Sequence, residues 1–234
     1  KTFSAVLSAN NLEKFDLLVN DACSMSSIEY LMVIQPFFDY TFASPEIVVD
    51  PGLDMTTLTT LLNENPDALE SVGVGLVDAY IGRDTIDRQG IDNEYLGLAF
   101  TDLSQFETVV ESVNAFAEFI NADPIGYSNI IGQARANTYT YSAFLDQNDL
   151  IDLGDLMQQL IAYSSDTQLI SLAQNVIRSL EEIRVYAQAA QRVQGRISFY
   201  SIYFPAKSKD FERDYTLITP LQGWGEMLRD YYNV

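Results

Sequence analysis

The chain has 234 residues, of which 47% are hydrophobic, as expected of a globular protein that can bury a substantial core. Its 33 Asp and Glu outnumber its 13 Lys and Arg, and the resulting charge of −20 argues against binding to nucleic-acid phosphates or to anionic membrane surfaces. One cysteine and no histidine exclude an internal disulfide, a Ser-His-Asp triad and a histidine-ligated metal built by this chain alone.

The first part of the chain predicts a strand–helix–strand unit. Residues 15–19 form a short apolar run bounded by polar residues, which is typical of a buried strand. A helix is expected from Ile28, with Ser26 or Ser27 as its N-cap, and a second strand over 40–44. Such a unit usually pairs its two strands in parallel through a right-handed crossover.

The later elements alternate between helical and extended patterns. Helices are expected over 55–62, 66–81, 106–120, 152–163, 166–191 and 221–232, strands over 95–101 and 197–204, and loops over 46–54 and 83–93. Asp102 or Ser104 is expected to cap the helix that begins near Phe106. The absence of repeats and of an obvious linker predicts a single α/β domain over residues 1–234, with a helical excursion.

Targeting segments are not evident in the sequence. The first ten residues lack the pattern of a signal peptide, and no window approaches the ~18 uncharged apolar residues of a membrane-spanning helix. Because residue 1 is Lys rather than Met, we expect that the chain derives from a longer precursor.

The clearest candidate for chemistry is the tripeptide Asp21-Ala22-Cys23. The predicted strand places Cys23 at its carboxyl end, where α/β folds put their active sites. A helix N-terminus is expected directly afterwards, and its dipole would favour the thiolate. The alternative is a small, buried and chemically inert cysteine. Local physics leaves both interpretations open.

Residues 15–29, Phe-Asp-Leu-Leu-Val-Asn-Asp-Ala-Cys-Ser-Met-Ser-Ser-Ile-Glu, resemble the catalytic-cysteine segment of the clostripain-like cysteine peptidases, which are related to caspases, legumain and gingipains. Residues 40–46 are similar to the family's next strand and its Ala-Ser-acidic turn. Ala134-Arg135, the segment 151–155 and the segment 201–205 are similar to later family elements. The resemblance spans about residues 15–232, and it implies a caspase-like, mostly parallel α/β sheet flanked by helices, with its first strands outside this chain.

The resemblance also implies roles for individual residues. Cys23 would attack a peptide carbonyl as a thiolate, and its backbone amide would help to hold the oxyanion. Asp21 matches the acidic residue at the base of the family's specificity pocket, which implies cleavage after Arg or Lys; the alternative role is a helix-terminal charge. Ser44 is expected to contribute to substrate binding. Asp50 and Asp54 would add negative potential, although a solvated loop is the favoured interpretation.

In this family a strand ending in His-Gly precedes the cysteine strand, and activation cleavage falls between them. We therefore expect Lys1 to lie near the start of a heavy chain, and the catalytic His to come from an upstream segment or a light chain of the same precursor. The resemblance further implies basic peptide or protein substrates, autoprocessing, and a secreted, periplasmic or cell-surface bacterial location.

Calcium is the one cofactor considered, because some clostripain-like enzymes depend on it. Residues 146–152 are rich in Asp, but their spacing differs from that of an EF-hand loop. Two other functions remain open. One is a non-catalytic, peptidase-like protein that holds basic peptides, and the other is an acidic α/β domain of unrelated function.

Overall fold

The computed structural model describes residues 3–49, 51–82, 96–141, 149–190, 193–218 and 221–233. Within these residues a mixed four-stranded sheet has the order β1 (Phe15–Val19), β2 (Phe38–Ala43), β3 (Gly97–Asp102) and β5 (Arg184–Ala189). Strands β1 and β2 are parallel, whereas β3 is antiparallel to both of its neighbours. A smaller sheet pairs β4 (Leu150–Asp152) with β6 (Ser201–Tyr203). The α/β class is confirmed, and so is the parallel pairing of the first two strands.

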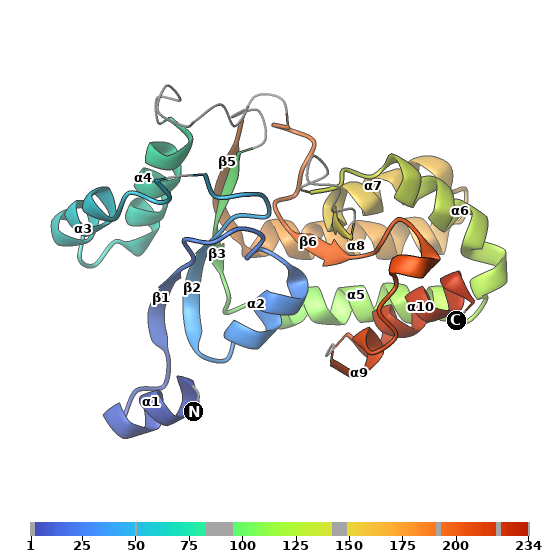
Figure 1. Ribbon diagram of the computed structural model, residues 1–234, viewed down its shortest axis with the longest axis horizontal. Helices are drawn as coiled ribbons and strands as arrows, with labels where there is room; N and C mark the ends of the chain where they lie inside the picture. The colour runs from blue at the N-terminus through green and yellow to red at the C-terminus, as the bar shows by residue number, and fades with distance from the viewer. Residues whose placement is uncertain are drawn as a thin grey trace.

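Helices cover both faces of the larger sheet (Figure 1). They are α1 (Phe3–Asn10), α2 (Ile28–Ile34), α3 (Met55–Glu64), α4 (Leu69–Ile81), α5 (Phe106–Asn121), α6 (Pro124–Asn137), α7 (Leu153–Tyr163), α8 (Thr167–Ile183), α9 (Tyr215–Ile218) and α10 (Gln222–Tyr232), with a short 3-10 helix at Ser208–Asp210. Helices α3 and α4 lie on one side, and α2, α5, α7, α8 and α10 lie on the other. None of the helices in the described ranges is long and apolar enough to cross a membrane.

Apolar cores lie on both faces of the sheet, between it and these helices. On the α4 side, the rings of Phe42 and Phe100 stack with centroids 4.8 Å apart. Gly73 lets α4 approach closely, because a Cβ there would lie 2.1 Å from the Phe100 ring. On the other side, the apolar stripe of α5 packs with α2, α7, α8 and the fully buried Trp224 of α10. Burial of this kind, rather than local propensity, supplies most of a helix's stability.

Helix α2 fixes the segment that follows the cysteine. Ser27 is its N-cap, and the Ser27 side chain accepts a hydrogen bond from Tyr30 N at 3.2 Å. Ile28, Leu31 and Ile34 recur at helical spacing, and all three are buried. The predicted helix start and cap are therefore confirmed.

Several expected boundaries are wrong. The helix expected over 166–191 ends at Ile183, because residues 184–189 pair with β3 as an edge strand. The Ala and Gln residues there favour a helix locally, but pairing along β3 outweighs that propensity. The strand expected over 197–204 shortens to β6, which pairs with β4 and not with the larger sheet.

Smaller differences concern caps and loops. The N-cap of α5 is Gln105, whose side chain makes no capping bond, whereas the Asp102 carboxylate accepts from Ser104 N at 2.7 Å just before the helix. Ala134 and Arg135 lie in the last turn of α6. The polar loop expected over 83–93 falls outside the described residues.

Candidate active site

Cys23 follows the carboxyl end of β1, and its side chain is exposed. The backbone of Val48 faces the sulfur: Val48 N donates to Cys23 Sγ at 3.4 Å, and Sγ lies 3.9 Å from Val48 O. The exposure excludes the interpretation of Cys23 as a buried core residue. The sulfur is accessible, and a backbone donor that a thiolate can accept from lies beside it.

The turn that carries Cys23 spans residues 23–26, and hydrogen bonds anchor it on two sides. Ser24 has a positive φ of 58°, uncommon outside glycine, and its amide donates to Glu46 O at 3.0 Å. On the other side, Ser26 Oγ donates to Phe199 O at 2.6 Å, and Ser201 N donates to Ser26 O at 3.0 Å. Backbone conformations of this kind are often held at functional sites by the surrounding structure.

This turn separates the cysteine from helix α2. The first helical residue is Ile28, as predicted, but residues 24–27 lie between it and Cys23, so the helix N-terminus does not directly follow the cysteine. The influence of a helix dipole falls off within the first turn. The Val48 amide, and not the helix terminus, is therefore the donor that the fold places at the sulfur.

The Cys23 amide is available as a donor. Within the described ranges, Cys23 N makes no backbone hydrogen bond, unlike Ser24 N next to it. A free amide beside a nucleophile is the type of group that forms an oxyanion hole.

Asp21 lies two residues before the cysteine, and its side chain is exposed. One carboxylate oxygen, Oδ1, accepts from Leu53 N at 2.9 Å. Gly52 has a φ of 81°, and a Cβ on Gly52 would lie only 2.5 Å from Asp21 Oδ1. The glycine thus permits the backbone to wrap around the carboxylate. The sequence pattern did not reveal this contact, although the Pro-Gly pair marked the turn.

The remaining residues expected at the site have structural contacts. Ser44 is fully buried, and its hydroxyl donates to Glu46 O and accepts from Glu46 N, both at 3.1 Å. Asp54 is the N-cap of α3, where Oδ1 accepts from Thr56 N at 3.0 Å. Asp50 lies outside the described residues.

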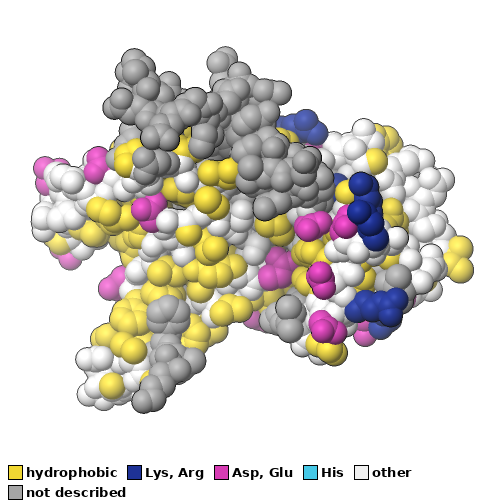
Figure 2. Space-filling model, in the orientation of Figure 1, with side chains coloured by type: hydrophobic (Ala, Val, Ile, Leu, Met, Phe, Trp, Pro, Cys, Tyr) yellow, Lys and Arg dark blue, Asp and Glu magenta, His cyan; other side chains and the backbone are white. Residues whose placement is uncertain are grey.

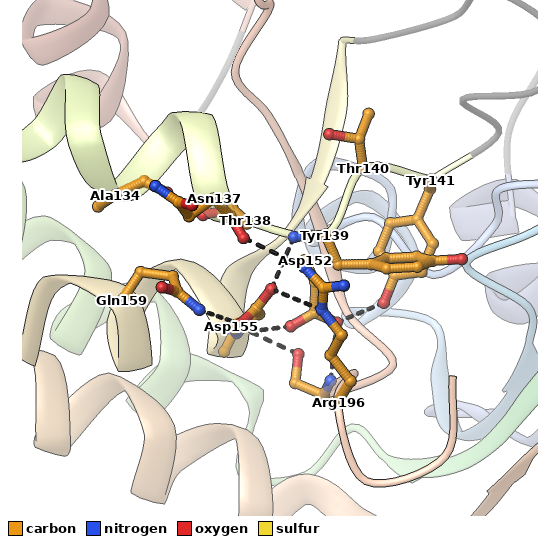
Figure 3. Close-up of polar contacts among 12 residues, drawn as sticks. Ala134, Asn137, Thr138, Tyr139, Thr140, Tyr141, Asp152, Asp155, Gln159 and Arg196 are labelled. Atoms are coloured by element: carbon orange, nitrogen blue, oxygen red, sulfur yellow. Dashed lines mark hydrogen bonds and ion pairs between the residues drawn. The ribbon is translucent and has the colours of Figure 1, made fainter. Parts of the chain in front are cut away.

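A second group of polar residues surrounds Asp152, where β4 meets α7 (Figure 3). Asp152 is buried at the N-cap of α7, where it accepts from the Tyr141 hydroxyl and, at 2.7 Å each, from the amides of Asp155 and Ser198. Burial raises the pKa of Asp152 from 3.8 to about 6, despite these donors. Burial and the adjacent Asp152 also raise the pKa of Tyr141 well above its usual value.

Among the described residues, no three His, Cys, Asp or Glu side chains gather to hold a metal ion. Of the stretch considered for calcium, residues 146–148 lie outside the described part of the chain. Asp152 directs its carboxylate at protein donors instead.

Sequence reasoning missed two residues near the cysteine turn. They are Glu46, whose carbonyl accepts from Ser24 N, and Tyr139, which binds the Glu46 side chain. The Tyr139 hydroxyl donates to Glu46 Oε1 at 2.8 Å, although the two residues are 93 positions apart. The alternating tyrosines Tyr139 and Tyr141 are a pattern more typical of core packing than of a ligand-binding surface. No sequence signal links Tyr139 to the acidic residue of the turn after β2.

Comparison with known proteins identifies what the chain is similar to. The family model of the clostripain family, peptidase C11, matches residues 1–232. A Bacteroides fragilis cysteine protease superposes with a TM-score of 0.66 at 15% identity, covering 97% of this chain and 95% of that one. A clostripain from Bacteroides thetaiotaomicron, in complex with the peptide inhibitor BTN-VLTK-AOMK, gives 0.62 at 13% identity, with 97% and 94% covered.

A secreted C11 cysteine protease from Bacteroides thetaiotaomicron, in complex with an irreversible peptide inhibitor, has a TM-score of 0.66 at 14% identity. The match covers 96% of this chain and 63% of that chain, which is longer. The search of curated proteins found no match.

Proposed function

The chain belongs to the clostripain family of cysteine peptidases, and from this premise we propose that Cys23 is its catalytic nucleophile. The observation that carries the proposal is the exposed thiol, the only one in the sequence, at the end of a sheet strand. It lies beside the Val48 amide and carries an unbonded amide of its own within the described residues.

In this mechanism the Cys23 thiolate attacks the carbonyl carbon of the scissile peptide bond, and the Cys23 N–H donates to the developing oxyanion. Collapse breaks the C–N bond and leaves a thioester on Cys23, while the departing amine takes a proton from a histidine of another segment. Water then attacks the thioester, releases the acid product and restores the thiol.

We propose cleavage after Lys or Arg, with Asp21 pairing with the basic side chain. Its Oδ2 makes no bond among the described residues, so it can accept from a substrate ammonium or guanidinium group. The inhibitor bound to the Bacteroides thetaiotaomicron clostripain has a peptide that ends in Lys, which supports a basic preference here. Because the Ser44 hydroxyl is committed to Glu46, we propose that Ser44 contributes through its backbone at the end of β2.

The histidine must come from outside these 234 residues, and we propose an upstream segment or light chain that pairs with β1. Within the described ranges β1 pairs only with β2, so its other edge is open (Figure 1). Phe15, Leu17, Leu18 and Val19 are only half-buried. Hydrophobic side chains also gather over β1 and α1 in Figure 2. An added strand would bury this apolar edge beside Cys23.

We further propose that residues 1–234 form one peptidase domain and that the protein acts outside the bacterial cytoplasm. A secreted structural neighbour supports that location. The competing function is a peptidase-like protein that binds basic peptides without cleaving them. The lack of histidine in this sequence favours such a binding protein over a peptidase that acts alone.

Hydrolysis of fluorogenic peptides by protein co-produced with its upstream segment tests the proposal. We expect cleavage after Lys or Arg that Cys23→Ala abolishes. Binding of basic peptides without cleavage, in material that contains a histidine-bearing partner, would favour the binding protein instead. Reading the upstream coding sequence for an apolar run ending in His-Gly tests the source of the histidine separately.

A further inference from the structure

The turn after β2 contacts the cysteine turn at two places. Glu46 O accepts from Ser24 N at 3.0 Å, and Val48 N donates to Cys23 Sγ at 3.4 Å. The position of residues 46–48 therefore decides both the path of the backbone after the nucleophile and the donor at its sulfur.

The Glu46 side chain points into the protein and meets Tyr139. Glu46 is 1% exposed, and its Oε1 accepts from the Tyr139 hydroxyl at 2.8 Å. A buried carboxylate needs donors to offset its lost hydration, so a hydroxyl held in place will hold the carboxylate in turn. The hydrogen bond thus ties the turn after β2 to a residue far along the chain.

Tyr139 is itself fixed by several contacts (Figure 3). Its amide donates to Asp155 Oδ2 at 2.6 Å, and its carbonyl accepts from Asp152 N at 2.9 Å. The Arg196 guanidinium lies over its ring, with Cζ 5.6 Å from the centroid, and is 3.6 Å from Asp155 Oδ2. The Tyr141 ring packs edge-on at 5.1 Å. The start of α7 therefore holds the Tyr139 backbone, and Arg196 in the loop before β6 holds its ring together with Tyr141.

We propose that Tyr139 is a positioning residue for Cys23, acting through the carboxylate of Glu46. The hydroxyl fixes Glu46, and Glu46 places both the carbonyl that holds Ser24 and the Val48 amide at the sulfur. The catalytic meaning of this arrangement rests on the proposed function, whereas its effect on the thiol does not.

Alkylation of Cys23 by iodoacetamide tests the proposal, because this is the only cysteine in the sequence and the reaction needs no catalytic histidine. Tyr139→Phe keeps the ring and removes the donor. We expect alkylation at pH 7 to slow about fivefold, the equilibrium factor for one net hydrogen bond. Equal rates for this variant and the wild type would overturn the proposal.

Tyr127→Phe is the matched control. The Tyr127 hydroxyl also donates to a carboxylate, Asp166 Oδ2, at 2.7 Å, but it joins α6 to the cap of α8. We expect its alkylation rate to equal that of the wild type. Slowing as large as that of Tyr139→Phe would mean a general loss of stability and would overturn the assignment.

Glu46→Gln tests whether Tyr139 acts through the carboxylate. A neutral amide accepts a weaker hydrogen bond than a carboxylate, so adding Tyr139→Phe in this background should slow alkylation less than it does in the wild type. Glu46→Gln also removes the buried charge of Glu46. If Tyr139→Phe alone does not fold, the variant that carries both substitutions can therefore be compared with Glu46→Gln. An undiminished effect of Tyr139→Phe would contradict the route through Glu46.

In the active, histidine-containing protein, Tyr139→Phe should lower kcat about tenfold or more with little change in KM, because a displaced nucleophile loses rate rather than affinity. A change confined to KM would argue against positioning of the nucleophile. If the active protein does not hydrolyse peptides while alkylation still responds to Tyr139→Phe, the proposed function fails and the positioning remains.

Discussion

Replacing Gly52 by alanine tests how the loop after β2 encloses Asp21. Gly52 has a φ of 81°, which L-residues rarely adopt. A Cβ there would lie 2.5 Å from Asp21 Oδ1 and 2.6 Å from Oδ2, well inside contact distance. The variant therefore faces a backbone cost and a collision with the carboxylate.

These two costs can be separated. The positive φ costs about 1–2 kcal/mol in a residue with a Cβ. Moving the carboxylate breaks its 2.9 Å bond from Leu53 N, which adds about 1–2 kcal/mol because Asp21 is exposed and water replaces part of the lost bond. Gly52→Ala should thus lower the free energy of unfolding by about 2–4 kcal/mol.

Gly195→Ala is the control, because Gly195 has a similar φ of 79° and nothing lies within 4 Å of its added Cβ. It should cost only about 1–2 kcal/mol. The assay is urea unfolding, with the midpoint and the m-value fitted together. In an Asp21→Ala background, the cost of Gly52→Ala should fall to that of Gly195→Ala. Equal costs for the two glycine variants in the wild-type background would refute the predicted collision.

Three further predictions concern the buried carboxylate, the core and the proposed specificity. Burial raises the pKa of Asp152 from 3.8 to about 6, so between these pH values the native state binds more protons than the unfolded state. The free energy of unfolding should therefore fall by about 3 kcal/mol as the pH rises through this window. Urea unfolding at a series of pH values measures this loss, which should be absent in Asp152→Asn. Trp224→Ala should cost about 3–5 kcal/mol by thermal or urea unfolding, since the ring is fully buried and its Nε1 donates to Tyr203 O at 2.9 Å; a cost below 1 kcal/mol would contradict this packing. In the active protein, Asp21→Asn should lower the kcat/KM ratio for basic over neutral substrates about tenfold or more, and an unchanged ratio would rule out Asp21 as the specificity residue.

The strand and helix around Cys23 could be predicted because local signals agree there. The apolar run 15–19 is short and bounded by polar residues, and Ser27 precedes three apolar residues at helical spacing. The turn between them could not be predicted. Its path depends on Ser24 bonding to Glu46 and Ser26 bonding to Phe199, both distant in sequence.

Non-local pairing also explains the larger error after α8. Residues 184–189 continue a helix-forming composition, yet every position from Gly97 to Thr101 of β3 finds a partner there, with one register shift that skips Val185. The energy of that ladder and of the apolar contacts with α4 outweighs local preference. The same limit hid the bond between Tyr139 and Glu46, because a single sequence shows residue types but not contacts made 93 residues away.

The central claim, that Cys23 is the nucleophile of a peptidase selective for basic residues, is tested most directly by covalent labelling. Protein that contains the histidine-bearing segment is treated with an irreversible Lys-directed acyloxymethyl ketone, and the adduct is located by peptide mass spectrometry. We predict a single adduct on Cys23, absent in Cys23→Ala and weaker in Asp21→Asn. If iodoacetamide modifies Cys23 fully but the ketone does not, in protein whose histidine-bearing segment is present, the claim of a Cys23 nucleophile selective for basic residues is contradicted.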